Sequence, residues 1–254
     1  MPRYAVRLSY KGTDYHGWQI QNNAKTIQGE LENAFSLLLK DKIALVGCGR
    51  TDTGVHAIDY YAYFNYEKEE LASPILEKLI HKLNGYLPKD IAIHEILEVK
   101  SDWHSRFDAK SRTYEYKVNT EKTPFLDKSS YYVPNFPVPI TIGIKKMNEA
   151  AQLLIGKKDF ECFSKSKTEV NNFMCDITRA EWVKTETGYS FFITANRFLR
   201  NMVRAIVGTL LEIGFGKREI EDLERILDSK SRSEAGYSVP AHGLYLIEVK
   251  YDWD

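Results

Sequence analysis

The chain has 254 residues, of which 43% are hydrophobic, 28% charged and 13% aromatic. This composition is typical of a globular protein and excludes a disordered or fibrous chain. Its 35 basic and 35 acidic side chains cancel, which argues against a protein that holds polyanions by bulk attraction alone. A nucleic-acid partner would require the basic residues to be segregated onto one face.

The sequence shows no pattern of a membrane segment or of a structural metal site. No stretch approaches about eighteen consecutive apolar residues, and the first ten residues lack the apolar core of a signal peptide. The three cysteines are odd in number and far apart, and neither they nor the six histidines have zinc-like spacing. We therefore expect a cytoplasmic protein with no membrane partner and no bound metal.

The first half of the chain alternates between the hydrophobic periods of strands and helices. The expected elements are a strand over 4–10, a polar loop over 11–25, a helix after the N-cap Thr26, a strand over 55–66, a helix with Ser73 as N-cap and Pro74 as its first residue, and a strand over 91–99. In the second helix, Ile75, Leu76, Leu79, Ile80 and Leu83 are expected to form the buried face.

The second half repeats this mixture. It predicts a strand over 112–119, an irregular connection over 121–141, a helix over 144–155, strands over 177–185 and 189–195, helices over 197–213 and 217–229, and a strand over 243–251. Thr187-Gly188 joins two strands as a hairpin, so we favour an α+β fold with antiparallel pairs over a doubly wound sheet. We place a domain boundary near residue 104, which gives α+β halves over 1–104 and 105–254.

The sharpest local feature is segment 47–57, which reads Gly-Cys-Gly-Arg-Thr-Asp-Thr-Gly-Val-His-Ala. Its glycines allow a substrate to approach the backbone closely, and Arg50 and Asp52 lie between them. Taken alone, the segment is explained as well by a tight turn in which Asp52 bonds nearby amides. His56 is likewise explained as an ordinary loop or capping histidine.

Two further segments combine positive charge with aromatic side chains. Arg197, Arg200 and Arg204 lie at i, i+3 and i+7 of the predicted helix and would share one face, either as a solvated basic surface or as a stripe that follows phosphates. Between 103 and 117, basic residues alternate with aromatic ones, including Tyr114. That pattern is typical of aromatic side chains in a core and also of surfaces that stack unpaired bases.

These segments together resemble the TruA family of tRNA pseudouridine synthases. The segments that carry the resemblance are 10–19, 26–28, 49–57, 83–88, 106–109, 112–116, 198–204 and 241–246, in the family's order and over essentially the whole chain. The chain departs from the family at Asp59-Tyr60-Tyr61, at Trp103-His104-Ser105 and over 159–176. These departures affect the expected surroundings of the base pocket and the expected RNA contacts more than the expected reaction.

The resemblance implies two ferredoxin-like halves whose sheets join across a central active-site cleft, usually in a homodimer. It implies an isomerase that converts uridine to pseudouridine at positions 38, 39 and 40 in the anticodon stem-loop of tRNA, with the target base flipped out of its stack. The reaction neither gains nor loses electrons or groups, so no cofactor or nucleotide is expected.

The resemblance also assigns roles to residues of this chain. Asp52 would be the catalytic carboxylate, either as a nucleophile or as the base that removes the 2′ proton. Arg204 would pair with it, and Arg50 would help displace the target base. Tyr114 would stack on the uracil and assist removal of the C5 proton. The remaining expected substrate contacts are Leu244 in the pocket wall together with His56, Arg106, Arg112, Arg197 and Arg200.

Two other classes of function fit parts of the sequence. The chain could be a tRNA-binding module whose chemistry is dispensable, although the retained catalytic residue types argue against binding alone. It could also be a glycoside hydrolase in which Asp52 attacks an anomeric carbon, but such enzymes need a second carboxylate and none lies near the motif. Release of free uracil in place of pseudouridine would identify the hydrolase.

Overall fold

The computed structural model describes residues 1–68, 71–134, 136, 138–165 and 171–253. Over these residues the chain has a mixed α+β fold with five α-helices and ten strands, and most strand pairs are antiparallel. The predicted α+β class is confirmed. The chain forms two compact units: unit 1 comprises 1–110 and the residues from 246 onward, and unit 2 comprises 111–245. The expected division into functional halves at residue 104 stays a prediction.

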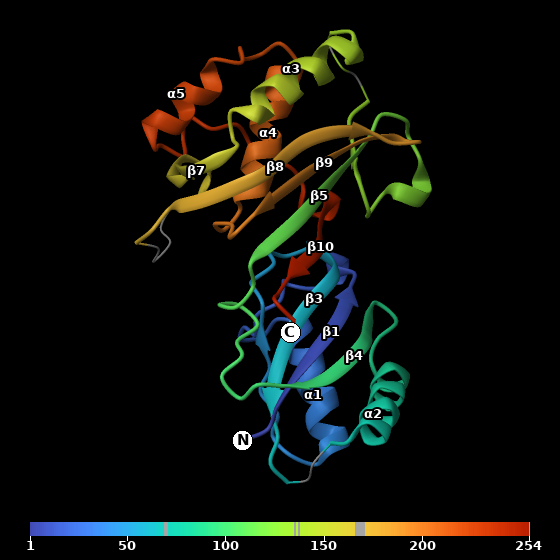
Figure 1. Ribbon diagram of the computed structural model, residues 1–254. Helices are drawn as coiled ribbons and strands as arrows, with labels where there is room; N and C mark the ends of the chain where they lie inside the picture. Colours follow the sequence, from blue (N-terminus) through green and yellow to red (C-terminus); the bar gives the residue numbers. More distant parts are fainter. Residues whose placement is uncertain (69–70, 135, 137, 166–170, 254) are drawn as a thin grey trace. The chain divides into compact units, whose positions relative to one another are not determined.

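Unit 1 is built on strands in the order β4-β1-β3-β10, in which β1 pairs antiparallel with both β4 and β3 (Figure 1). Its elements are β1 (Arg3–Tyr10), α1 (Ile27–Leu39), β2 (Val46–Gly47), β3 (His56–Asn65), α2 (Ser73–Tyr86), β4 (Ile91–Val99) and the part of β10 (Leu244–Lys250) after Tyr245. The two helices contact each other, and α2 packs on β4. Tyr4, Val6 and Leu8 alternate along β1 and are fully buried, as the period of two predicted.

The helices of unit 1 begin and end where local chemistry allows. The Thr26 hydroxyl accepts a hydrogen bond from the Gly29 amide at 3.3 Å, which confirms the predicted N-cap. The second helix differs by one residue, because Ala72 is its N-cap and Ser73 is already helical. Ile75 is 41% exposed, so it lies outside the buried face that the apolar spacing predicted. A stripe of three leucines makes that face instead: Leu76, Leu79 and Leu83.

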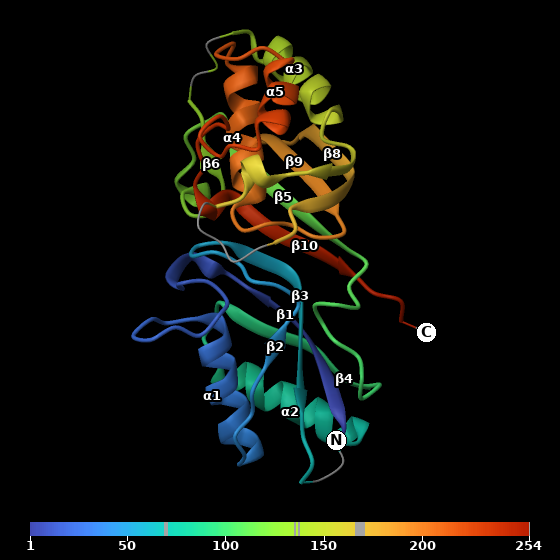
Figure 2. The ribbon, with the colours of Figure 1, turned by 90° about the vertical axis from the view of Figure 1, so that its left-hand side faces the viewer.

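In unit 2 the sheet has the strand order β5-β9-β8-β7 with antiparallel neighbours, and β6 pairs with β5 in parallel. Its elements are β5 (Ser111–Asn119), β6 (Tyr131–Tyr132), α3 (Ile140–Gln152), β7 (Gly156–Asp159), β8 (Met174–Lys184), β9 (Gly188–Ala195), α4 (Met202–Gly214) and α5 (Asp222–Ser229). Figure 2 shows the three helices gathered on one side of this sheet. The predicted hairpin of β8 and β9 is present.

Several boundaries in unit 2 correct the sequence prediction. The helix predicted from Arg197 begins at Met202, because Asn201 has a left-handed backbone with φ 68° that no helix accommodates. The helix predicted from Lys217 begins at Asp222. The predicted helix over 144–155 instead follows Pro139 and ends at Gln152. The short strands β6 and β7 had no recognisable pattern, since two and four residues are too few to show a period.

The cysteines provide a test of this packing, since all three are buried thiols. Burial raises the pKa of Cys162 to about 12 and that of Cys175 to about 11. Disulfide reagents attack the thiolate, so at pH 8 the reactive fraction of Cys175 is about a hundredfold below that of an ordinary thiol. We expect no rapid reaction of the native protein with Ellman's reagent at pH 8, and three equivalents after denaturation. Rapid labelling of any thiol in the native protein would show that this thiol is not buried.

Candidate active site

Asp52 lies in the loop between β2 and β3, and its side chain is half-buried. The amide of Val55 donates to the Asp52 carbonyl at 3.1 Å, and Gly54 adopts a φ of 81°. The turn that the sequence also suggested is therefore present and is closed by the main chain. Gly17, with a φ of +85°, packs so tightly that a Cβ there would lie 2.4 Å from the Thr51 carbonyl oxygen. The loop is thus held close to segment 12–18.

The two residues predicted beside Asp52 differ in exposure. Arg50 is exposed. His56 is only 1% exposed, and its Nδ1 accepts a hydrogen bond from the Gly12 amide at 3.1 Å. An Nδ1 that accepts carries no proton, so the neutral ring has its proton on Nε2. The bond to Gly12 supports the explanation of His56 as a residue that fixes a loop.

Tyr114 and Tyr116 project from β5 of unit 2. Tyr116 is buried, donates to the Pro240 carbonyl at 2.9 Å, and burial raises its pKa. Tyr114 is half-buried and packs edge-to-face against Phe198, with ring centroids 5.1 Å apart. The ring of Tyr114 therefore has a fixed partner on one edge while part of its surface reaches solvent.

Arg204 lies in the first turn of α4 and is half-buried. Its Nε donates to the Val239 carbonyl at 2.7 Å, and the Val239 amide returns a bond to the Arg204 carbonyl at 3.2 Å. The same segment continues through Pro240, which Tyr116 contacts, to Leu244, which is 6% exposed at the start of β10. Segment 239–244 thus contacts both Arg204 and Tyr116 and ends at Leu244.

The expected stripe of three arginines on one helical face is wrong. Arg197 and Arg200 precede α4 in an irregular segment, so their i, i+3 and i+7 spacing to Arg204 does not place them on a common face. The segment is held by non-helical bonds: the Asn201 side chain donates to Ser238 Oγ at 2.6 Å, and the Arg200 carbonyl accepts from the Lys165 amide at 3.0 Å. Arg200 is exposed and Arg197 is half-buried.

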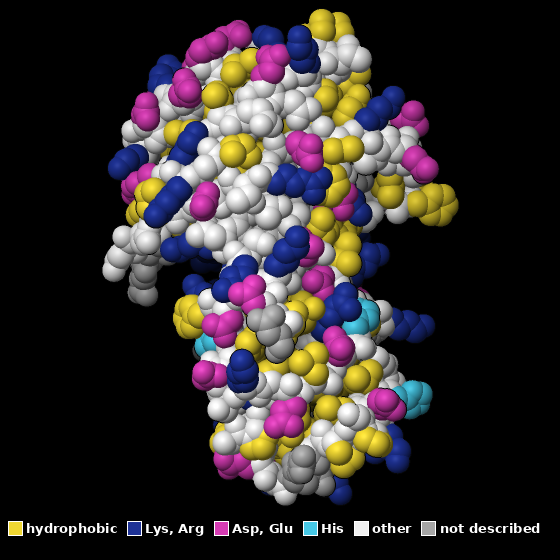
Figure 3. Space-filling model, viewed as in Figure 1, with side chains coloured by type: hydrophobic (Ala, Val, Ile, Leu, Met, Phe, Trp, Pro, Cys, Tyr) yellow, Lys and Arg dark blue, Asp and Glu magenta, His cyan; other side chains and the backbone are white. Residues whose placement is uncertain are grey.

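The other predicted RNA contacts also lie at surfaces of their units. Arg112 on β5 donates through one guanidinium nitrogen to the Asn196 carbonyl at 2.8 Å, which fixes the start of the irregular segment. Arg106 is exposed in the loop after β4, with its guanidinium 5.7 Å from the Phe107 ring centroid. On the face in Figure 3, Lys and Arg are interspersed with Asp and Glu on both units, so this face carries no continuous basic stripe.

One set of contacts that supports segment 239–244 was not predicted from the sequence. Arg232 donates to the Gly236 carbonyl at 3.0 Å and to Ser238 Oγ at 2.9 Å, and Ser238 also accepts from Asn201. These bonds fix the chain immediately before Val239. No periodic pattern or motif spacing distinguishes Arg232 or Asn201 in the sequence, because their roles depend on contacts between separate segments.

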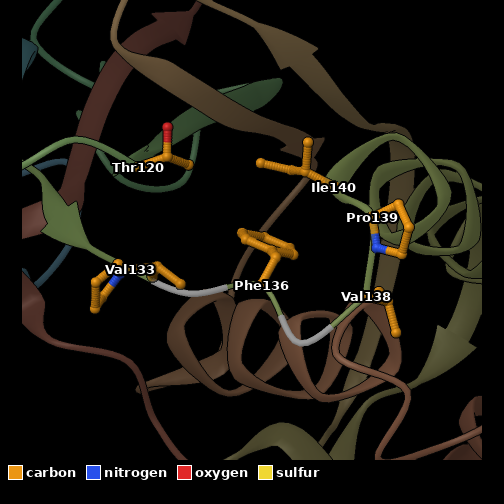
Figure 4. Close-up of a pocket in the computed structure, with 7 residues that line it drawn as sticks. Thr120, Val133, Phe136, Val138, Pro139 and Ile140 are labelled. Carbon is orange, nitrogen blue, oxygen red and sulfur yellow. The ribbon is translucent and has the colours of Figure 1, made fainter.

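Other features of the described residues do not define a site. None of their His, Cys, Asp and Glu side chains form a group of three or more arranged to hold a metal ion, and no helix among them has the length and apolarity to cross a bilayer. A hollow of about 470 Å³ in unit 2 is lined by Thr120, Val133, Pro134, Phe136, Val138, Pro139 and Ile140 (Figure 4). None of these residues is ionisable, so the hollow offers no acid or base.

Comparison with known proteins identifies the family. A family model described as tRNA pseudouridine synthase matches residues 150–252. The chain is 45% identical to a tRNA pseudouridine synthase A of Bacteroides fragilis over 98% of this chain and 96% of the relative. It is 44% identical to the Parabacteroides distasonis protein of the same name over 99% and 96%, and 41% identical to that of Anoxybacillus flavithermus over 99% and 100%. The chain therefore belongs to the tRNA pseudouridine synthase A family.

Proposed function

We propose that the chain converts uridine to pseudouridine at positions 38, 39 and 40 in the anticodon stem-loop of tRNA. The observation that carries the proposal is the 45% identity over nearly the full length to a relative named for this activity. The loop geometry supports it, because the half-buried carboxylate of Asp52 lies in a tightly fixed turn. The chain acts as an isomerase in the cytoplasm.

The reaction breaks the bond between C1′ of the ribose and N1 of uracil and forms a bond between C1′ and C5. The C5 proton leaves to solvent and N1 gains a proton, so electrons and groups balance without a redox partner. This chemistry requires an ionised carboxylate near C1′ and C6 in a site that excludes water. Asp52 supplies that carboxylate, by attack on C1′ or C6 or by removal of the 2′ proton to give a glycal.

Residues of unit 2 complete the proposed site across a cleft between two ferredoxin-like halves. Arg204 pairs with the carboxylate of Asp52. Its Nε is used by Val239, so the far end of the guanidinium is the part that meets a carboxylate. Tyr114 stacks on the flipped uracil and assists removal of the C5 proton. Leu244 closes the pocket wall.

The RNA backbone and base are held by the remaining predicted residues. Arg50 helps displace the target base, and its exposure supports that role. The phosphate contacts come from four arginines: Arg106, Arg112, Arg197 and Arg200. Burial of His56 and its bond to Gly12 favour a part in fixing the loop over direct contact with the base. The working unit is a homodimer, which doubles the surface available to the RNA.

The proposal is tested with tRNA transcripts that carry tritium at C5 of uridine. The wild-type protein should release tritium from a transcript with uridine at positions 38 to 40, and cytidine at those positions should remove the signal. Sequencing after carbodiimide treatment should then locate pseudouridine at the same positions. Absence of release from a bound transcript would identify a binding module, and free uracil in solution would identify a hydrolase.

A further inference from the structure

Three buried aromatic side chains of unit 1 contact the loop that carries Arg50 and Asp52. Tyr10 at the end of β1, Trp18 in the following loop and Tyr60 in β3 are 4%, 3% and 0% exposed. We call these residues the aromatic bracket. The rings of Trp18 and Tyr60 stack with centroids 4.2 Å apart, and Tyr10 packs edge-on against Tyr60 at 5.5 Å. The bracket is therefore a single packed body beneath the loop.

Each member of the bracket bonds to the loop at a different atom. The Tyr10 hydroxyl lies 2.8 Å from Thr51 Oγ1, the Trp18 amide donates to the Thr51 carbonyl at 3.2 Å, and the Tyr60 hydroxyl donates to the Gly49 carbonyl. These atoms flank the functional side chains along the chain. Gly49 and Thr51 enclose Arg50, and Thr51 immediately precedes Asp52.

The contacts are closer than general packing requires. A Cβ added at Gly47 would lie 2.2 Å from the Tyr60 hydroxyl and 2.6 Å from the Trp18 ring. Beyond Asp52, the Val55 amide closes the turn on the Asp52 carbonyl. The backbone of Asp52 is thus anchored on both sides, by the bracket before it and by the turn after it.

We infer that the hydroxyls of Tyr10 and Tyr60 are positioning groups, which orient Arg50 and Asp52 for the isomerisation without touching the substrate. The inference rests on the proposed function, since it assigns the bracket a share in that reaction. A buried ring alone would stabilise the fold, whereas the hydroxyls bond to residues on either side of Arg50 and next to Asp52. Misplacement of a reacting group by about 1 Å is enough to cost about a hundredfold in rate.

The test removes each hydroxyl while keeping its ring, in Tyr10→Phe and Tyr60→Phe. Single-turnover rates of tritium release are measured over a range of enzyme concentrations, which separates the maximal rate constant from the half-saturating concentration for tRNA. We expect each variant to lose about tenfold in the maximal rate constant and to change less than about twofold in half-saturation. Thr51→Val should lose as much of the maximal rate constant as Tyr10→Phe, and the double variant Tyr10→Phe/Thr51→Val should lose no more than either single variant. Thr51→Ser, which keeps a hydroxyl, should recover most of the loss.

Tyr66→Phe is the matched control. Tyr66 is 4% exposed, and its hydroxyl donates to the Leu39 carbonyl at 3.3 Å, in the same unit but away from the loop. This variant should lower the melting temperature about as much as the other two and leave the rate constant unchanged. If the bracket variants lower only the melting temperature, the hydroxyls are structural and the inference is wrong. A wild-type protein that releases no tritium would instead refute the proposed function.

Discussion

Replacing Asp52 by asparagine should abolish tritium release from labelled tRNA, with a loss of more than about a thousandfold in the single-turnover rate. Asparagine has the size of aspartate and leaves the main-chain bond from Val55 to residue 52 in place. It removes the charge that either route requires, because an amide neither attacks C1′ nor removes the 2′ proton. The fold of the loop should therefore persist while the chemistry stops.

The control for this variant is Asp41→Asn. Asp41 is a surface acid of the same unit and lies 3.3 Å from the Lys68 ammonium, so its loss removes a charge outside the proposed site. Asp41→Asn should keep the wild-type rate within about twofold, as expected for a surface ion pair. Binding of tRNA to Asp52→Asn should stay within a few-fold of wild type. Release by Asp52→Asn at a tenth of the wild-type rate would contradict the assigned role.

Arg204→Leu should lose most turnover, by about a hundredfold or more, because it removes the cation that pairs with the proposed catalytic carboxylate of Asp52. Arg204→Lys retains the charge but not the planar fork of donors, so it should recover only part of the rate.

Loss of Arg204 also removes its bond to the Val239 carbonyl, so a matched variant is needed. Arg218→Leu serves, because Arg218 is another partly buried arginine of unit 2 whose Nε bonds to Glu212 Oε2 at 2.6 Å. It should lower stability to a similar extent without a comparable loss of turnover. Equal activity losses in the two variants would show that Arg204 acts only through folding.

Elements with a long hydrophobic period were the ones that the sequence predicted well. The strand Arg3–Tyr10, the helix after Thr26 and the hairpin of β8 and β9 each show many repeats of one period or a recognisable cap. The start of α4 was missed because Arg197 to Asn201 contains no proline or glycine, and the left-handed Asn201 is stabilised by a bond to distant Ser238. A helix start set by a tertiary contact leaves no local pattern.

The residues of the candidate site likewise divide into those that the sequence indicated and those that it did not. Arg50 and Asp52 lie in a compact motif that the sequence shows directly, and family resemblance pointed to Tyr114 and Arg204. The supporting contacts could not be predicted from the sequence, because Tyr10 and Thr51 are 41 residues apart. The bond between their side chains forms only when β1 pairs with β3. A motif indicates which groups react, whereas the groups that hold them become apparent only when distant strands are paired.

The return of β10 to unit 1 determines the order in which the protein can be completed on the ribosome. Residues 1–110 emerge first, but the edge of β3 gains its neighbour β10 only after the whole of 111–245 has been synthesised. The closing contacts include the Lys110 amide on the Lys250 carbonyl and the Tyr251 hydroxyl on the Ser105 carbonyl. At about 5–20 residues per second, the nascent chain therefore carries an open strand edge for about 7 to 27 seconds. That interval is when the chain is most exposed to mispairing with its neighbours on the same messenger.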